Sequence, residues 1–478
     1  MALLEQLEQA GPNRQQATGQ DTLPSDAVQA PRHSYSIGLR TRIVLALIAI
    51  ACVKQVVLAV AYPPFEGHDE VAHLGYLATL ADDGRLPTFS DDLPASLEEY
   101  SRFTLDWPAV YTANHPPLYY VVSVPAYKLA GSDHLAQLYA VRLVSIPFFL
   151  LTVWLTYLTA RMLFPTDNLI VLGAPAIVAF QPQLGFEGAI VNNDMLAIVF
   201  GTLLLYLCLR AIRDGLSIRL ALIIGLVCGL GLLTKATLLA LLPIVAAVCV
   251  LLCWPRPWTR VRSRDWWQST LVRALVVVGP AVALALPWYL YLRRTYGDFT
   301  AFEATQELQR NWNHPAGTLT ELLFSPLFHK ERIHETWGYY GWRLIPLDSR
   351  ELAVVYVMMT LAGLGALLGL LRWFGHVRDN GWPGRTTFAG QQATSITTLT
   401  AASLLMYGAM VYFGTMFLLT QARYFFPVLP VAIVLATAGL RVLVPEGWYR
   451  AATIVLVGGA VGFQFLILTK LVLPYAYL

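Results

Sequence analysis

Residues 43–62 read IVLALIAIACVKQVVLAVAY, and two prolines follow directly. The stretch contains a single charged side chain, Lys54. About 20 apolar residues in a helix span the hydrocarbon core of a bilayer, so this stretch predicts a transmembrane helix. Arg40 and Arg42 precede it, and basic residues stay on the cytosolic side of a membrane. The helix is therefore expected to enter from the cytosol and to act as an uncleaved signal anchor.

Apolar stretches of similar length recur toward the C-terminus. Together with the first stretch they predict about eleven transmembrane helices, and hence an all-α polytopic membrane protein. Residues 116–131 are apolar but too short for a comfortable span, and they predict an interfacial or re-entrant helix. The further spans are predicted near residues 138–163, 168–185, 190–210, 219–234, 236–254, 272–292, 351–372, 398–420, 424–441 and 451–470.

The composition of the 478 residues agrees with a membrane domain. Hydrophobic residues make up 56% and charged residues 13% of the chain, and the mean hydropathy is +0.54. Soluble chains carry roughly 25% charged residues, which excludes a soluble multidomain enzyme. The net charge of +3 is too small to indicate a nucleic-acid partner.

The distribution of charge predicts the orientation in the membrane. Residues 1–39 lack apolar periodicity and are expected to form a disordered cytosolic tail, followed by an integral membrane domain at 40–478. Arginines gather on the side of this tail, most densely at 256–264, which supports a cytosolic N-terminus. On the opposite side, two long loops at about 63–137 and 293–350 are rich in Trp, Tyr, His and carboxylates. Long loops of this kind are often functional, so any chemistry is expected on the extracytoplasmic side.

The first outer loop opens with PPFEGHDEVAHLGY, residues 63–76, where a new helix is expected to begin. Asp69 and His73 lie four residues apart and therefore share one face of that helix. Asp69 or Glu70 can simply cap the helix and complement its dipole. The alternative is that Asp69 belongs to a functional site.

The order of several short motifs resembles a known family. An Asp-Glu pair directly after the first span is followed by His-x-Gly and then by His-Pro-Pro-Leu at 115–118, although the last motif is also an ordinary helix start. This pattern is similar to the polyprenyl-phosphate-dependent glycosyltransferases of the GT-C superfamily, in particular the protein O-mannosyltransferases and the lipid A aminoarabinose transferases. Later segments resemble motifs of the family in the same order: AVRLVS (140–145), VNND (191–194), LLTK (232–235), ETWGYYGW (335–342) and QARYFFP (421–427).

The resemblance implies a GT-C-like helical membrane domain with an active site at its extracytoplasmic surface. In that superfamily a carboxylate of the first outer loop deprotonates the acceptor or holds a metal, and Asp69 is the matching position. Glu70 is the second catalytic candidate, although adjacent helical residues point about 100° apart. If Asp69 and Asp194 converge, they could hold a divalent cation such as Mg²⁺ or Mn²⁺, and no other cofactor is expected. Asp194 is explained equally well as a helix N-cap.

Transfer of a sugar from a polyprenyl phosphate requires a base for the acceptor hydroxyl and cations for the departing phosphate. Candidate cations on the outer side are His115, Arg142, Lys235, Arg423, Arg293 and Arg294. Anchoring to lipid headgroups is the simpler explanation of Arg293 and Arg294 and stays an alternative for Arg423, and an interfacial aromatic belt is the alternative for the tryptophans. The other candidate substrate-binding residues are polar or aromatic members of the motifs: His73, Asp194, Glu335, Trp337, Trp342 and Tyr424.

The sequence as a whole predicts a glycosyltransferase that moves one sugar from a polyprenyl-phosphate donor to a lipid, glycan or protein acceptor outside the cytosol. Inversion follows if Asp69 supports a single displacement. Two alternatives stay open: a transporter or flippase of a lipid-linked glycan, which a charge such as Lys54 would suit, and an enzyme of en bloc oligosaccharide transfer or glycan polymerisation. Neither long outer loop contains an Asn-x-Ser/Thr site, so the expected location is a bacterial plasma membrane.

Overall fold

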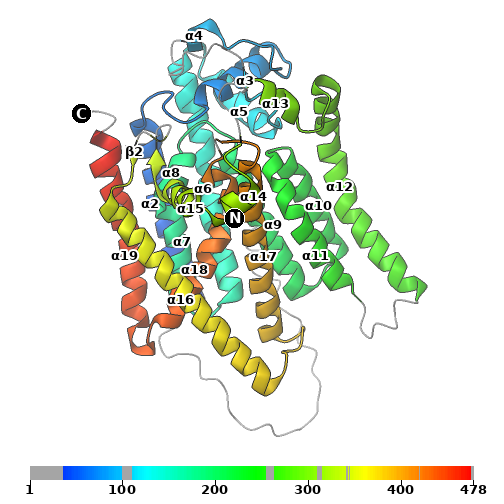
Figure 1. Cartoon of the computed structure of the whole chain (residues 1–478), viewed down its shortest axis with the longest axis vertical. Helices are drawn as coiled ribbons and strands as arrows, with labels where there is room; N and C mark the ends of the chain where they lie inside the picture. Colours follow the sequence, from blue (N-terminus) through cyan, green and yellow to red (C-terminus); the bar gives the residue numbers. More distant parts are fainter. Residues whose placement is uncertain are drawn as a thin grey trace. The chain divides into compact units, whose positions relative to one another are not determined.

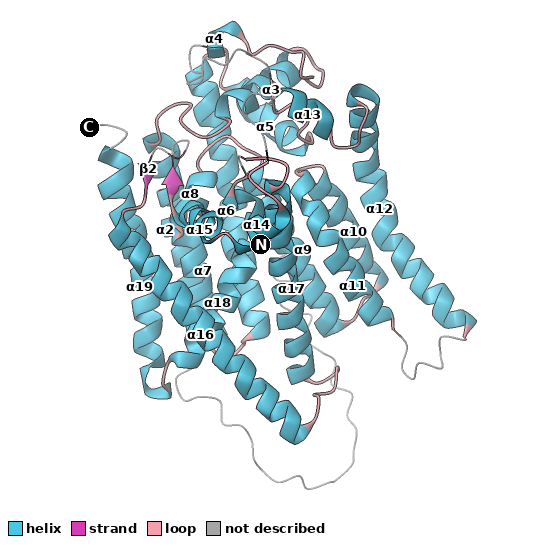
Figure 2. Cartoon of the chain, viewed as in Figure 1, coloured by secondary structure: helices cyan, strands magenta, loops and turns pink. Residues whose placement is uncertain are grey.

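The computed structural model describes residues 36–98, 110–254, 263–308, 315–340, 343, 345–418 and 420–474. Most of the predicted tail and the candidate site residue Trp342 lie outside the described residues. Helices account for most of the described chain, and one short pair of strands accompanies them (Figure 2).

Within the described residues, nine helical segments are long and apolar enough to cross a membrane, which confirms an all-α multi-pass membrane protein. Two shorter apolar helices, α7 (Asn168–Phe180) and α10 (Ile218–Leu232), occupy the other two predicted spans. The nine segments are α2 (Ile37–Ala61), α6 (His134–Leu163), α9 (Asp194–Asp214), η1 (Ala236–Leu241) with α11 (Leu242–Cys253), α12 (Arg264–Tyr296), α16 (Ser349–Asn380), α17 (Phe388–Gly414), η3 (Ala422–Val428) with α18 (Leu429–Leu443), and η4 (Glu446–Trp448) with α19 (Tyr449–Ile467) and η5 (Leu468–Val472).

The predicted continuous span at 168–185 is wrong, because the chain breaks after α7. Gln181 adopts an extended conformation, and Pro182 starts the short helix α8 (Pro182–Glu187). Proline fits the first turn of a helix, where its missing N–H has no partner to lose. The break places Glu187, the last residue of α8, close to the start of α9.

Three spans begin earlier than predicted, each at a hydroxyl cap. Ser36 caps α2, Ser263 caps α12 and Thr387 caps α17, and in each case the side-chain oxygen accepts a backbone N–H of the first turn. These caps satisfy donors that an α-helix leaves without partners at its start. Apolar periodicity alone therefore underestimates the length of the spans.

The two outer segments between spans contain short elements and touch each other. The first holds α3 (Glu70–Asp82), α4 (Ala95–Glu98) and α5 (Leu118–Leu129), whose 12 residues match the predicted short helix. The Phe89 N–H donates to Tyr296 Oη (3.2 Å), and Asn114 Nδ2 donates to Thr305 Oγ1 (3.1 Å). Figure 1 shows α3, α4, α5 and α13 gathered at one end of the helices. The second segment holds α13 (Phe302–Leu308), α14 (Leu319–Phe324), α15 (Pro326–Trp337) and the antiparallel strands β1 (Tyr339–Tyr340) and β2 (Ile345–Pro346).

Glycines allow neighbouring helices to approach closely. A Cβ at Gly365 of α16 would lie 1.9 Å from the Gly439 carbonyl oxygen of α18, and a Cβ at Gly201 of α9 would lie 2.4 Å from the Pro427 carbonyl oxygen of η3. Small residues at membrane helix interfaces permit such contacts. The second contact fixes η3 against α9, two elements that supply charged side chains to the same region.

Candidate active site

Asp69 stands immediately before α3, but its side chain does not cap that helix. Its φ of 63° is left-handed, and its carboxylate makes no hydrogen bond to the first turn. This conformation costs a non-glycine residue roughly 1–2 kcal/mol, and Asp is one of the residues that tolerates it best. The carboxylate instead accepts hydrogen bonds from Arg423 Nη2 (2.7 Å) and Tyr111 Oη (3.2 Å). The capping interpretation of Asp69 is therefore wrong.

Asp69, Asp194, Lys235 and Arg423 form one group of charges, which we name the ionic cluster. Asp194, the first residue of α9, accepts from Lys235 Nζ at 2.5 Å and from Arg423 Nη1 at 3.4 Å. Arg423 thus lies between two carboxylates, one of them 354 residues away in sequence. The ring of Tyr424 accompanies the cluster, with its centroid 5.8 Å from Lys235 Nζ and 6.0 Å from Arg423 Cζ. Four of the predicted site residues therefore meet, with Tyr424 beside them.

The charges of the ionic cluster keep Asp69 ionised. Burial by itself would raise the pKa of Asp69, but the charge of Arg423 and its hydrogen bond lower that pKa well below its usual range. Burial lowers the pKa of Lys235, and Asp194 opposes this shift. A carboxylate with such a low pKa is a weak base as long as Arg423 remains bound to it. A role as base requires that Arg423 transfers its contact to another anion.

His73 and His115 lie together near Asp69 and share one tyrosine. Their ring centroids are 5.5 Å apart, and their Nδ1 atoms lie 2.8 Å and 3.4 Å from the hydroxyl of Tyr120. Burial lowers the pKa of both rings, to about 3 for His115, where the charge of Lys235 adds to the effect. These shifts favour a neutral His115, which can donate or accept a hydrogen bond, over the predicted cationic role.

Glu70 and Arg142 form a separate ion pair that is fully buried. Arg142 Nε and Nη2 donate to the two carboxylate oxygens of Glu70 at 2.8 Å and 2.6 Å. The remaining Arg142 contacts go to the carbonyl oxygens of Ala59, Tyr62 and Pro63, and the Val191 N–H donates to Glu70. Both side chains are 0% exposed, so the pair ties the end of α2 to the start of α9. This placement differs from the predicted catalytic and phosphate-binding roles, because the contacts of both side chains are used inside the protein.

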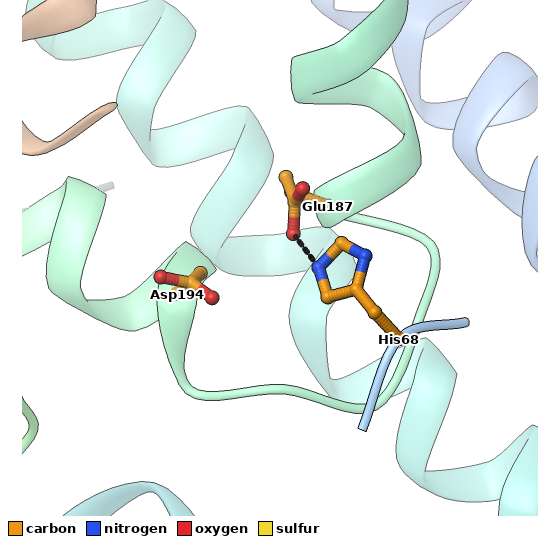
Figure 3. Close-up of side chains that lie close together, drawn as sticks. All are labelled: His68, Glu187 and Asp194. Carbon is orange, nitrogen blue, oxygen red and sulfur yellow. Dashed lines mark hydrogen bonds and ion pairs between the residues drawn. The ribbon is translucent and has the colours of Figure 1, made fainter. Parts of the chain in front are cut away.

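His68 and Glu187 make a further buried pair beside the ionic cluster. His68 Nε2 lies 3.1 Å from Glu187 Oε2, which also accepts from Asn192 Nδ2 at 2.8 Å. One ligand atom each from His68, Glu187 and Asp194 lie within 4.8 Å of one another, and Figure 3 shows the three side chains converging. An imidazole with two carboxylates is a donor set that divalent transition metals accept. This group shares Asp194 with the predicted metal pair of Asp69 and Asp194 but does not include Asp69.

Glu335, on α15, contacts the backbone that carries Arg423. Its Oε2 accepts the Ala422 N–H at 2.8 Å, and its carboxylate pairs with Arg332 and Arg343. Both arginines also donate to the Thr420 carbonyl oxygen. Burial raises the pKa of Glu335 although the two arginines act in the opposite direction. Glu335 is thus placed to hold the start of η3 rather than to join the ionic cluster.

Trp337 belongs to an apolar cluster away from these charges. It is partly buried and packs against a cluster of buried residues that includes Tyr62, Phe186, Tyr340 and Leu347. This environment connects the end of α15 with the end of α2 and with α8, and it is a packing role. The substrate-binding role of Trp337 stays a prediction.

Sequence reasoning missed His68, Tyr111 and Tyr120, and it ranked Glu187 below Asp194 as a candidate. The sequence does contain a signal for Glu187, because it is an isolated charge that follows Gln181 and Gln183 within an otherwise apolar stretch. Isolated charges in membrane segments are rare and mark functional or paired positions. His68 gave no such signal, since its partner lies 119 residues away.

The chain is similar to known glycosyltransferases. A family model described as dolichyl-phosphate-mannose-protein mannosyltransferase matches residues 114–284, which include His115, Arg142, Asp194 and Lys235. The resemblance predicted from the motifs is thus confirmed over this part of the chain. No curated protein sequence matches the chain.

Several solved structures are also similar. ArnT from Cupriavidus metallidurans, bound to undecaprenyl phosphate, has a TM-score of 0.49 and 17% identity, over 91% of this chain and 74% of that chain. The S. cerevisiae protein O-mannosyltransferase Pmt1–Pmt2 complex bound to the sugar donor has a TM-score of 0.40 and 15% identity, over 57% and 36%. The Archaeoglobus fulgidus oligosaccharyltransferase in complex with Zn and sulfate has a TM-score of 0.42 and 13% identity, over 90% and 52%.

Proposed function

We propose that the chain transfers one sugar from a polyprenyl-phosphate donor to an acceptor hydroxyl on the extracytoplasmic side of a membrane. The observation that carries this proposal is the ionic cluster, in which a carboxylate suited to a base and two cations suited to a phosphate stand together. The family-model match over residues 114–284 supports the same reaction class. In bacteria this location is the plasma membrane.

The reaction uses Asp69 as the base in a single displacement. The acceptor oxygen attacks the anomeric carbon, its proton passes to Asp69, and the bond between that carbon and the phosphate oxygen breaks. The donor is a phosphodiester with one negative charge, and the leaving polyprenyl phosphate carries two. Arg423 and Lys235 supply two positive charges where this charge grows, so the leaving group needs no acid.

Donor binding also prepares the base. When the phosphate takes Arg423 and Lys235 as partners, Asp69 loses the ion pair that lowers its pKa, and its proton affinity rises. The carboxylate is then free for the acceptor hydroxyl. The identity of sugar and acceptor is left open by this chemistry, which requires only a phosphate-linked sugar and a hydroxyl.

The transporter alternative receives less support. Lys54, the charge within α2 that would suit it, donates to the Ala179 carbonyl oxygen at 2.7 Å and lies 4.4 Å from the ring centroid of Phe149. A lysine with these contacts ties α2 to the end of α7. It has a structural explanation that needs no transported charge.

The test compares membranes that contain wild-type protein, Asp69→Asn or no protein in a host that makes polyprenyl-phosphate sugars. We expect mass spectrometry of lipid extracts to show these sugars consumed by the wild type and accumulated with Asp69→Asn, because a general base contributes about 10²- to 10⁴-fold in rate. Asp83→Asn, an exposed change in the same outer segment, is the control. Turnover by folded Asp69→Asn within tenfold of wild type would refute the assignment of Asp69.

A further inference from the structure

His68, Glu187 and Asp194 come from three elements and bring their ligand atoms to within 4.8 Å of one another. His68 lies in the turn before α3, Glu187 ends α8 and Asp194 begins α9. The exposed fractions of these residues are 7%, 1% and 3%, so bulk water hydrates none of them well. Figure 3 shows that the side chains converge on a common space rather than point apart.

The charges around this group do not balance. Three carboxylates, those of Asp69, Asp194 and Glu187, face two cationic side chains, Lys235 and Arg423. Among the residues that the structure describes, His68 is the one potentially cationic partner of Glu187, and its other donors are the amides of Asn192 and Gln183. A buried carboxylate without a fixed positive charge is costly, and a bound cation removes that cost.

The donor set also indicates which kind of cation fits. Mg²⁺ and Ca²⁺ prefer oxygen ligands alone, whereas an imidazole nitrogen with carboxylates suits Zn²⁺, Mn²⁺ and similar ions. His68 therefore distinguishes this group from a site made of carboxylates only. The hydrogen bonds from Asn192 and Gln183 orient Glu187, as outer partners of metal ligands commonly do.

We propose that His68, Glu187 and Asp194 bind one divalent transition-metal ion. When the metal binds, His68 and Glu187 each bond to it in place of their mutual hydrogen bond. The ion pair between Lys235 and Asp194 is kept. The ion neutralises Glu187 and joins the turn that carries Asp69 to the end of α8 and the start of α9. This site goes beyond the proposed transfer reaction, in which Asp69, Arg423 and Lys235 need no metal.

The test measures metal binding directly, without donor or acceptor. The full chain is purified with an affinity tag that contains no histidine, stripped with a chelator, and titrated with MnCl₂ while electron paramagnetic resonance records free Mn²⁺. We expect one Mn²⁺ per chain and a ¹⁴N coupling in the pulsed spectrum from His68. Removing a ligand in His68→Ala or Glu187→Gln should weaken binding about tenfold or more. His134→Ala, a matched change at the start of α6, should bind as wild type.

The outcomes separate the metal site from the transfer reaction. Asp69→Asn should keep the Mn²⁺ stoichiometry whether or not it transfers sugar. If His68→Ala does not fold, as judged by size-exclusion chromatography, the ¹⁴N coupling of the wild type decides. A stoichiometry near zero, a bound signal without ¹⁴N coupling, or equal binding by His68→Ala and His134→Ala would overturn the proposal and leave an adventitious ion only.

Discussion

The two long outer segments contribute to the ionic cluster in different ways. The first segment sends Asp69 into the cluster and His68 beside it. The described part of the second segment instead contacts elements that lie next to the cluster. Glu335 accepts the Ala422 N–H of η3, and the Tyr339 N–H donates to Gln183 of α8. Both segments are rich in carboxylates and aromatic rings. The amino-acid composition of a segment therefore indicates a functional region. It does not distinguish the groups proposed to react from the groups that position them.

A second contrast lies within the first segment. Asp69 and Glu70 are neighbours, yet one carboxylate faces the ionic cluster and the other is sealed against Arg142. The left-handed backbone at Asp69 turns the chain just before α3, so the two side chains leave in different directions. In its contacts Glu70 is more similar to Glu335 than to Asp69. Glu70 and Glu335 each pair with arginine and also accept a backbone N–H from another element.

The largest effect on stability is expected from breaking the Glu70–Arg142 pair. Arg142→Leu leaves a fully buried carboxylate without its partner, which typically costs about 3–5 kcal/mol. We expect a marked fall in the melting temperature in detergent, measured by intrinsic fluorescence. Arg294→Leu, an exposed arginine at the end of α12, is the matched control and should change stability by less than about 0.5 kcal/mol. Equal melting temperatures for the two variants would contradict a structural role for the pair.

The sequence predicted the spans and the convergence of distant motifs better than the roles within them. Apolar length located the helices, and the ordered motifs named Asp69, Asp194, Lys235 and Arg423 as candidates for one site, which the structure brings together. The role of Arg142 could not be predicted, because a phosphate-binding arginine and a buried structural arginine look alike in sequence. The His68–Glu187 pair was hidden for another reason: its proximity depends on the break between α7 and α8.

Glu335→Gln tests whether the second segment positions the ionic cluster. The amide still accepts the Ala422 N–H, but Arg343 and Arg332 lose the Glu335 carboxylate, and Arg332 keeps only its 3.3 Å contact to Glu331. Hydrogen bonds to charged groups contribute about 1.5–3 kcal/mol. Arg423 follows on η3 and is proposed to act on the phosphate as its charge grows. We therefore expect kcat to fall about tenfold with a smaller change in KM.

The control for this experiment is Glu331→Gln, on the same helix, because the Glu331 side chain is half exposed and contacts Arg332 only at 3.3 Å. It should leave both constants near the wild-type values. A purely structural role for Glu335 would lower the amount of folded enzyme without moving kcat per folded molecule. That result would remove the distinction between the second segment and an ordinary packing region.

The smallest expected effect concerns pH and the neutral state of His115. Its pKa is lowered to about 3 in the folded protein, whereas an unfolded histidine titrates near about 6.5. Between these values the unfolded chain binds more protons, so stability falls as the pH drops, by up to about 1.4 kcal/mol per pH unit. The melting temperature of His115→Asn should therefore fall less than that of the wild type between pH 7 and pH 5. The control, His134→Asn, should show the wild-type fall. An unchanged dependence would mean that His115 is charged in the folded protein, and the first segment would then supply a cation as well as a base.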